Sequence, residues 1–368
     1  MNKPALIFTL FILCNSMLLA QSPFIVKEPD VFPHQERREI IMPELDGFEI
    51  MKGDFHMHTV FSDGQVWPEE RVREAWRDGL DVIAISDHVE FMPKSEFVKG
   101  SLNRVIEIAR PAAERMGIML INSAEITRAM PPGHFNALFL TDIDALNLPG
   151  AMETIEEAHR QGAFIIWNHP CWERQQPDTC KWFPEHELLL QKGMLHGIEV
   201  YNWDNWYPIA IDWARDKNLA FFAVTDMHGV MPDLRATGRY LRPMTLVMVT
   251  EKTEEGLRQG MLNRRTVAFF AGKLAGPEEW LRKIFDASVQ ITTERRGRGN
   301  RQATATLTNV TDIPVMLQSA DGGQYYLGAR SQITIQLHRT REGIQAPFTI
   351  TNFMTGSNQR LQVVLKAQ

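Results

Sequence analysis

Histidine and acidic side chains recur in this sequence at one kind of place, the end of a short apolar run. His56 and His58 close the first run with one residue between them, so in a strand they would face the same side. Five of the six histidines concerned lie at or just past the C-terminal end of a run, whereas His134 opens one. The whole set is His56, His58, Asp63, His88, Glu125, His134, His169, Asp226 and His228.

This set has the chemistry of a metal centre. Imidazole and carboxylate ligands together suit zinc, manganese or iron, and their number predicts two or three divalent ions. A single His-X-His pair would be weak evidence, so the prediction rests on the joint pattern. Three other histidines are interpreted as packing or surface residues. His159 and His186 fall on expected helices, and His196 precedes a strand at the opposite end.

The apolar runs predict the elements that position these residues. Between residues 50 and 272 they alternate with amphipathic stretches, as in buried parallel strands joined by helices. The runs are Gly53–His58, Asp81–Ser86, Met119–Glu125, His134–Leu140, Ala163–Asn168, Gly197–Tyr201 and Phe221–Asp226, with Leu246–Val249 as an optional eighth. The pattern predicts an α/β fold, either a βα barrel or an open parallel sheet, with the site at the C-terminal rim of the strands.

Beyond residue 272 the pattern changes. Residues 273–284 are expected to form a linker. Over 285–368 apolar and polar residues alternate, as in Ala303–Leu307 and Ile333–Leu337, with breaks at Gly and Asn. Such alternation predicts a small antiparallel β-sandwich. We therefore expect a catalytic barrel over 50–272 and a C-terminal sandwich domain over 285–368.

The N-terminus is expected to be a targeting segment. Lys3 precedes an apolar run that ends at Ala20, the pattern of a cleavable signal peptide over residues 1–20. A membrane anchor is the alternative, but the run is short for a span and is interrupted at Cys14–Ser16. We expect a periplasmic or secreted protein with an N-terminal extension over 21–49 and no membrane segment in the mature form.

Two cysteines would remain after cleavage, and the net charge limits the partners. Cys171 and Cys180 lie in one loop, where the sequence leaves open a disulfide or two free thiols. The net charge of −6 argues against dedicated nucleic-acid binding. It does not exclude a small anionic substrate, because three divalent ions would outweigh the charge of three ligating carboxylates.

In order and spacing, these motifs resemble the polymerase and histidinol phosphatase (PHP) superfamily. The resemblance covers residues 50–272 and rests on Asp54–Thr59, Ser62–Gly64, Asp87–Glu90, Glu125, Asn168–Pro170 and Asp226–His228. It implies a distorted seven-stranded βα barrel with a trinuclear metal centre. The segment Met130–Asn136, the signal peptide and the C-terminal β region are similar to a branch of secreted bacterial phosphodiesterases.

The resemblance also assigns ligands to each ion. The first ion would be bound by His56, His58, Glu125 and Asp226. Glu125 would bridge to a second ion bound by His134 and His169, and the third would be bound by Asp63, His88 and His228. Some family members have a histidine one residue after the Asp63 position, where this chain has Gly64.

The implied reaction is hydrolysis of phosphate esters by metal-activated hydroxide that attacks phosphorus. Glu125 and Asp226 are the predicted catalytic carboxylates. Arg128, Arg235 and Arg239 follow ligand-bearing segments and are candidates to bind the non-bridging phosphoryl oxygens.

Other residues are given supporting roles. Asp87 and Glu90 could orient ligands, or could be a helix cap and a salt-bridge partner. The stretch Tyr201–Trp206, with Trp167 and Trp172, could line a pocket for an apolar ester group, with Tyr201 and Asn202 nearest the site, or its aromatic residues could belong to the core.

Several functions remain open at this point. Hydrolysis of small phosphodiesters is favoured. A phosphomonoesterase of the histidinol-phosphatase type is the nearest alternative, because a monoester carries one more negative charge and should need more fixed cations. An amidohydrolase-like C–N hydrolase and a non-catalytic metal or phosphate binder are the others, and the complete ligand set argues against the last.

Overall fold

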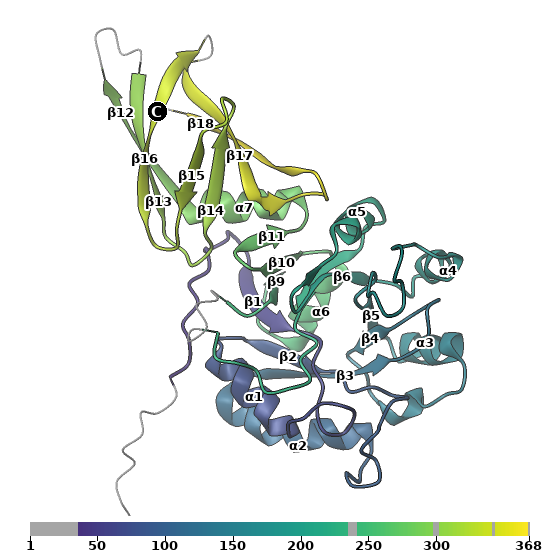
Figure 1. Ribbon diagram of the computed structural model, residues 1–368. Coiled ribbons are helices and arrows are strands. Elements are labelled where there is room, and N and C mark those ends of the chain that lie inside the picture. The colour runs from purple at the N-terminus through teal and green to yellow at the C-terminus, as the bar shows by residue number, and fades with distance from the viewer. Residues whose placement is uncertain (1–35, 235–240, 297–301, 341–342, 367–368) are drawn as a thin grey trace, which may run out of the picture. The chain divides into compact units, whose positions relative to one another are not determined.

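A computed structural model of the chain describes residues 36–234, 241–296, 302–340 and 343–366 (Figure 1). The predicted signal peptide lies outside these residues and stays a prediction. The chain divides into two units, Met1–Glu36 and Arg37–Gln368, and every element below belongs to the second. Among the described residues no helix has the length and apolar character needed to cross a membrane.

The first part of the chain that carries regular structure begins with strand β1 and ends with β10. Its elements are β1 (Glu49–Asp54), α1 (Pro68–Arg77), β2 (Val82–Ile85), α2 (Leu102–Met116), β3 (Met119–Ile126), β4 (Phe135–Leu138), η1 (Asp144–Leu146), α3 (Ala151–Arg160), β5 (Phe164–Trp167), α4 (Pro184–Gln191), β6 (Gly197–Asn202), β7 (Asn205–Trp206), α5 (Pro208–Asp216), β8 (Ala220–Val224), β9 (Met244–Val249), α6 (Glu254–Leu262) and β10 (Thr266–Phe270). All residues of β2, β5 and β8 are buried, as expected for strands covered on both faces.

The strands of this part pair as a mixed sheet. The pairs β1–β2, β2–β3, β5–β6 and β6–β8 are parallel, whereas β3–β4, β4–β5, β1–β9 and β9–β10 are antiparallel. The expectation of parallel strands throughout is therefore wrong. The α/β class is confirmed, and the closed seven-stranded barrel stays a prediction.

Strand β4 reverses direction because its connection to β3 is short. Only residues 127–134 separate the two strands, and a parallel crossover needs about a dozen residues or more. Phe135, the first residue of β4, therefore pairs with Ile126 at the end of β3 and with Trp167 at the end of β5. This reversal brings the start of β4 to the rim where its neighbours end.

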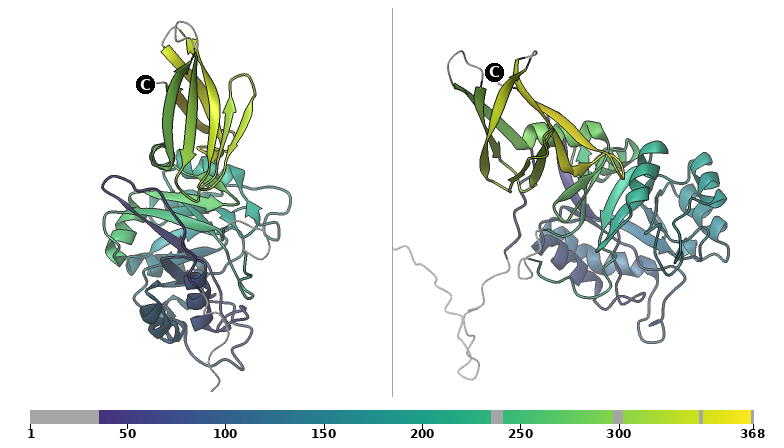
Figure 2. Two further views of the ribbon diagram at one scale, coloured as in Figure 1. Left: turned by 90° about the vertical axis from the view of Figure 1, so that its left-hand side faces the viewer. Right: turned by 45° about the horizontal axis from the view of Figure 1, so that its top comes forward.

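The C-terminal region consists mainly of antiparallel strands. It comprises β11 (Lys273–Ala275), α7 (Glu278–Ser288), β12 (Val289–Arg296), β13 (Gln302–Asn309), β14 (Val315–Ser319), β15 (Gln324–Leu327), β16 (Gln332–Thr340), β17 (Gly343–Met354) and β18 (Arg360–Lys366). The strands pair in two groups, β12–β13–β16 and β15–β14–β17–β18. Both views of Figure 2 show the two groups next to each other. A two-layer sandwich stays a prediction.

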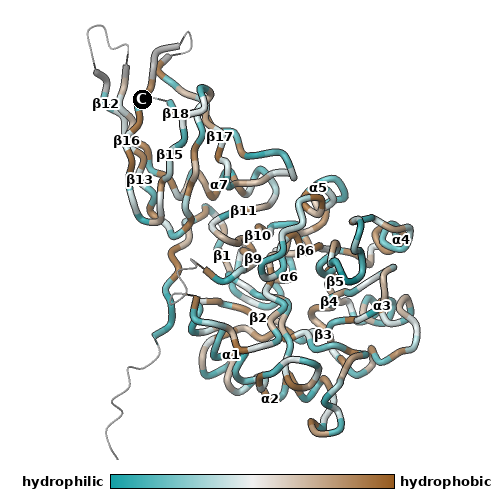
Figure 3. Tube along the Cα trace, viewed as in Figure 1, coloured by the Kyte–Doolittle hydropathy of each residue, from teal (hydrophilic) through white to brown (hydrophobic). Residues whose placement is uncertain are grey.

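The stretch expected as a linker carries regular structure. Lys273–Ala275 forms β11, which pairs with β10 and, in parallel, with β17, and Glu278 begins α7. Buried Leu274 and Ala275 explain why this short strand joins both neighbours. Figure 3 shows, in contrast, a hydrophilic connection between β5 and α4, which carries part of the site described next.

Candidate metal centre

All nine side chains selected from the sequence converge at one place. Their ligand atoms form four overlapping groups, in each of which the atoms lie within 4.8 Å of one another. The groups are His58/Asp63/His88/His228, His56/His58/Glu125, His56/His169/Asp226 and Glu125/His134/His169. The fold explains this convergence, because His134 opens the reversed strand β4 while the other histidines follow strands that run the opposite way.

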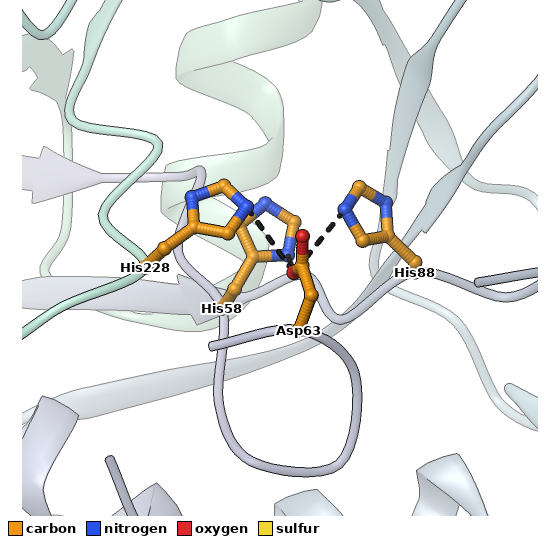
Figure 4. Close-up of side chains that lie close together, drawn as sticks. All are labelled: His58, Asp63, His88 and His228. Carbon is orange, nitrogen blue, oxygen red and sulfur yellow. Dashed lines mark ion pairs between the residues drawn. The ribbon is translucent and has the colours of Figure 1, made fainter. Parts of the chain in front are cut away.

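Asp63 is the centre of the group that Figure 4 shows. Its Oδ1 lies 3.2 Å from His228 Nε2, 3.4 Å from His88 Nε2 and 4.0 Å from His58 Nδ1. The ring of His58 stacks with both of the other rings, with ring centroids 4.4 Å from His88 and 4.1 Å from His228. The loop after β1 therefore folds back far enough to bring Asp63 to the rim.

Gly64 allows this loop to turn. A Cβ at Gly64 would lie 2.5 Å from the carbonyl carbon of His58, closer than real contacts allow, so no side chain fits. The absence of a histidine at this position is thus required by the local backbone. Asp87 holds the same loop, accepting hydrogen bonds from Thr59 N (2.7 Å) and Ser62 Oγ (2.5 Å).

Glu125 links the other groups. Its Oε1 lies 3.2 Å from His134 Nδ1, 3.4 Å from His56 Nε2 and 3.5 Å from His169 Nε2. Its Oε2 lies 2.6 Å from His88 Nδ1. The side chain is completely buried, so its charge must be balanced by neighbouring groups.

The donor set contains buried atoms that the neighbouring side chains do not satisfy and that a metal ion could bind. Among the described residues, His58 Nδ1, Asp63 Oδ1 and Glu125 Oε2 are buried and make no hydrogen bond, although each lies within 4 Å of another site residue. Buried polar atoms without a hydrogen bond cost free energy, and a cation bound among them would interact with each. Mixed nitrogen and oxygen donors of this kind suit zinc, manganese or iron.

The electrostatics of the cluster keep its carboxylates ionised. Burial alone would raise the pKa of Glu125, but His88 and His56 hold it well below its usual range. Burial would lower the pKa of His88, yet Glu125 and Asp63 raise it to about 10. His58 is different, because burial lowers its pKa to about 4. The carboxylates thus attract positive charge strongly, as a cation site requires.

Glu199 is a site residue that the sequence analysis missed. It is fully buried in β6, and its carboxylate lies 2.7 Å from His56 Nδ1 and accepts hydrogen bonds from His169 N (2.6 Å) and Asn202 Nδ2 (3.0 Å). A carboxylate behind a metal-binding histidine fixes the ring and its tautomer. The available signal was an acid inside the otherwise apolar run Gly197–Tyr201, because charged residues are seldom buried unless they are paired.

We expect Glu199→Gln to weaken metal binding by about 10- to 100-fold, the usual cost of losing such a partner. The amide keeps the size of the side chain but removes the charge that faces His56. Competition with a chromophoric chelator would measure the affinity, with Asp216→Asn at an exposed position of α5 as the acid-to-amide control. Equal affinities for the two variants would exclude this role.

Arg71 was also missed, and it connects two ligand-bearing segments. Its fully buried guanidinium donates to the carbonyls of His58 (2.8 Å), Met227 (2.8 Å) and His228 (3.0 Å) and pairs with Glu74 at 2.7 Å. Arg71 therefore joins the loop after β1 to the loop after β8. No pattern marked it, since an arginine on an amphipathic helix is usually exposed.

The prediction that Arg128 binds phosphoryl oxygens stays a prediction, and the structure shows other partners for this side chain. Its guanidinium pairs with Glu90 at 2.7 Å and donates to Thr154 Oγ1 (3.1 Å) and to the carbonyls of residues 148 and 149 (2.6 and 3.1 Å). These acceptors lie on the loop before α3 and in α3 itself, and Arg128 is absent from the described lining of the cavity at the donor groups. Arg235 and Arg239 lie outside the described residues.

A cavity of about 760 Å³ opens onto the donor groups. Trp172, Trp203 and Asn202 line it, as the sequence suggested. Trp167, in contrast, is fully buried and stacks on His186 with ring centroids 3.7 Å apart. Tyr201 stacks on Phe270 and is absent from the described lining of the cavity.

The connection between β5 and α4 contains a disulfide. Cys171 and Cys180 are bonded, which decides between the two alternatives that the sequence left open. His186, interpreted as a packing residue, is fully buried beneath this connection, with its Nε2 2.7 Å from the Pro132 carbonyl.

Comparison with known proteins identifies the family. The fold and the site define an α/β protein in which histidine and carboxylate side chains form a cluster that could bind several metal ions. Residues 54–194 match the PHP domain model. A crystal structure from Bacteroides vulgatus ATCC 8482 is 41% identical, covers 90% of this chain and 99% of its own, and superposes with a TM-score of 0.85. The chain belongs to the PHP family.

That Bacteroides protein is described as a two-domain protein containing a predicted PHP-like metal-dependent phosphoesterase. Two uncharacterized proteins of Methanocaldococcus jannaschii are also similar. MJ1587 is 26% identical over 166 residues, 41% of this chain and 82% of that protein. MJ1295 is 47% identical over 49 residues, which are 13% of this chain and only 22% of the length of that protein.

Proposed function

We propose that this protein is a metal-dependent phosphoesterase that hydrolyses small phosphodiesters. One observation carries the proposal: nine imidazole and carboxylate side chains, among them the fully buried Glu125, meet at one place in a chain of the PHP family. The relative from Bacteroides vulgatus, described as containing a predicted phosphoesterase of this type, supports the general reaction.

We assign residues to each of two or three divalent ions as the resemblance to the PHP superfamily implies. His56, His58, Glu125 and Asp226 would hold one, and Glu125 would share a second with His134 and His169; the observed groups support this in part, with His56, His58 and Glu125 in one group and Asp226 grouped with His56 and His169. Asp63, His88 and His228 would hold the third, with His58 beside them. Zinc, manganese or iron bound here would polarise a phosphoryl oxygen and lower the pKa of a water molecule.

The protein's own residues would position these groups and the ester. Glu199 would keep the His56 ring oriented, and Asn202 donates to both Glu199 (3.0 Å) and Asp226 (3.2 Å), so it fixes the two carboxylates relative to each other. The buried floor of the cavity would exclude bulk water, which strengthens electrostatic interactions with the phosphoryl group.

The charges around the cavity favour a diester over a monoester. Among the described residues, Arg174 is the only arginine that lines the cavity, and it is exposed, while Arg128 is engaged elsewhere. Glu173 and Asp204 line the same cavity. A diester carries one negative charge fewer than a fully ionised monoester, so it needs fewer fixed cations.

We expect the metal-loaded protein to hydrolyse bis(4-nitrophenyl) phosphate with a higher kcat/KM than 4-nitrophenyl phosphate. Elemental analysis should accompany the assay after loading with zinc, manganese or iron, and a chelator should abolish turnover until metal is restored. Turnover of the monoester alone would replace the diester proposal by a phosphomonoesterase. Failure to hydrolyse either ester would contradict the phosphoesterase itself.

We also propose that the enzyme works in the periplasm or outside the cell. The predicted signal peptide motivates this proposal, and the Cys171–Cys180 disulfide supports it, because such bonds persist in oxidising compartments.

A further inference from the structure

The disulfide closes a loop that adjoins the candidate metal centre. Cys171 comes two residues after His169, and its bond to Cys180 encloses Trp172, Glu173 and Arg174. These three residues all line the cavity. The loop therefore contributes a continuous part of the cavity wall immediately after a candidate ligand.

Further hydrogen bonds hold this loop in place. Trp172 N donates to the His169 carbonyl (2.9 Å), so the backbone at the start of the loop is tied to the segment that carries His169. Gln176 is buried and donates to the Pro170 carbonyl (2.5 Å), and Gln175 donates to the Arg128 carbonyl (2.9 Å). The loop is thus fixed to both neighbouring segments before any ligand binds, which reduces the entropy lost on binding.

The Trp172 ring packs against two candidate ligands. Its centroid lies 5.2 Å from that of His169 and 5.7 Å from that of His134. The Arg174 guanidinium lies 5.6 Å from the centre of the same ring, which places a cation beside it. A group attached to a phosphoryl centre near these histidines would therefore meet the indole.

A second aromatic side chain lies on another side of the donors. Phe91 lines the cavity, is 49% exposed, and packs against His88 with ring centroids 5.9 Å apart. His88 belongs to the Asp63 group, whereas His134 and His169 belong to the Glu125 group. The cavity thus offers aromatic surface beside two different donor groups, while its other rim residues include the polar Asp204 and Asn205.

We propose that the disulfide-closed loop is a stacking subsite, and that the preferred substrate is a phosphate ester with a flat aromatic group attached. Trp172 is the specificity-determining residue. This inference rests on the proposed phosphoesterase function. A planar ring gains from offset stacking on an indole, whereas a saturated ring of equal carbon number gains only from apolar burial.

Two non-hydrolysable anions separate these effects. Calorimetry on the metal-loaded protein would give the Kd of methyl(phenyl)phosphinate and of methyl(cyclohexyl)phosphinate, which both carry the single negative charge of a diester and have the same number of carbons. We expect the phenyl compound to bind about tenfold more tightly. Trp172→Phe should keep most of this preference. Trp172→Leu, which keeps apolar surface but not the flat ring, should remove it.

Two further variants test the loop and provide a control. The double variant Cys171→Ser/Cys180→Ser should reduce the preference, because the loop loses its closure. Phe97→Ala removes a ring that is 81% exposed and outside the described lining of the cavity, so the preference should persist. Equal Kd values in the wild type, or an unchanged ratio in Trp172→Leu, would overturn the inference. Because Kd is measured without turnover, that result is distinguishable from failure of the phosphoesterase proposal.

Discussion

Glu125→Gln should lower kcat/KM for bis(4-nitrophenyl) phosphate by more than about 100-fold. Replacing a residue that only holds a metal ligand in place already lowers metal affinity or activity by about 10- to 100-fold, and Glu125 is itself a candidate ligand. Glu125 belongs to two of the donor groups, and both of its oxygens face imidazoles. The amide preserves the shape but offers a single neutral oxygen. We therefore expect elemental analysis to show the loss of metal as well as of turnover.

A matched control distinguishes this loss from a general effect of the substitution. Glu107→Gln makes the same chemical change on the exposed face of α2, where the carboxylate pairs only with Arg104 among the described ionic partners. Thermal unfolding should show that the Glu125 variant remains folded. Full metal content with turnover within tenfold of the wild type would exclude Glu125 as a shared ligand.

The composition of the centre could be predicted because its residues share a local signature. Each except Asp63, which needs the loop after the first run to fold back, lies beside a short apolar run. His56 and His58 are two residues apart, which places both on one side of a strand whatever the rest of the fold does. His134 shows the limit of this reasoning. Its place at the start of a run contradicted an all-parallel sheet, and only the pairing of β4 with β3 and β5 explains how it reaches the others.

Side-chain direction could not be predicted in the same way. Arg128 stands two residues after the end of β3, where a phosphate-binding arginine could lie, but carbonyl groups of the loop before α3 bind its guanidinium. Arg71 is the reverse case. Its acceptors include the carbonyl of His228, which is 157 residues away in the sequence, so its burial depends on tertiary contacts that helix periodicity does not contain.

Arg71→Met should destabilise the protein by about 3–5 kcal/mol, the usual effect of removing one of the two charged partners of a buried ion pair. Glu74, only 5% exposed, would keep its charge but lose the partner at 2.7 Å. The carbonyls of His58, Met227 and His228 would lose their donor at the same time. Chemical denaturation would measure the change in the free energy of unfolding.

The double variant Arg71→Met/Glu74→Gln separates stability from positioning. Neutralising Glu74 should recover part of the lost stability, because no buried charge is left without its partner. It cannot restore the bonds to the His58 and His228 segments, so both variants should lose the same ion, the one assigned to Asp63, His88 and His228. Full metal content in the double variant would show that Arg71 stabilises the fold without positioning that group, because the two loops would then hold their ligands unaided.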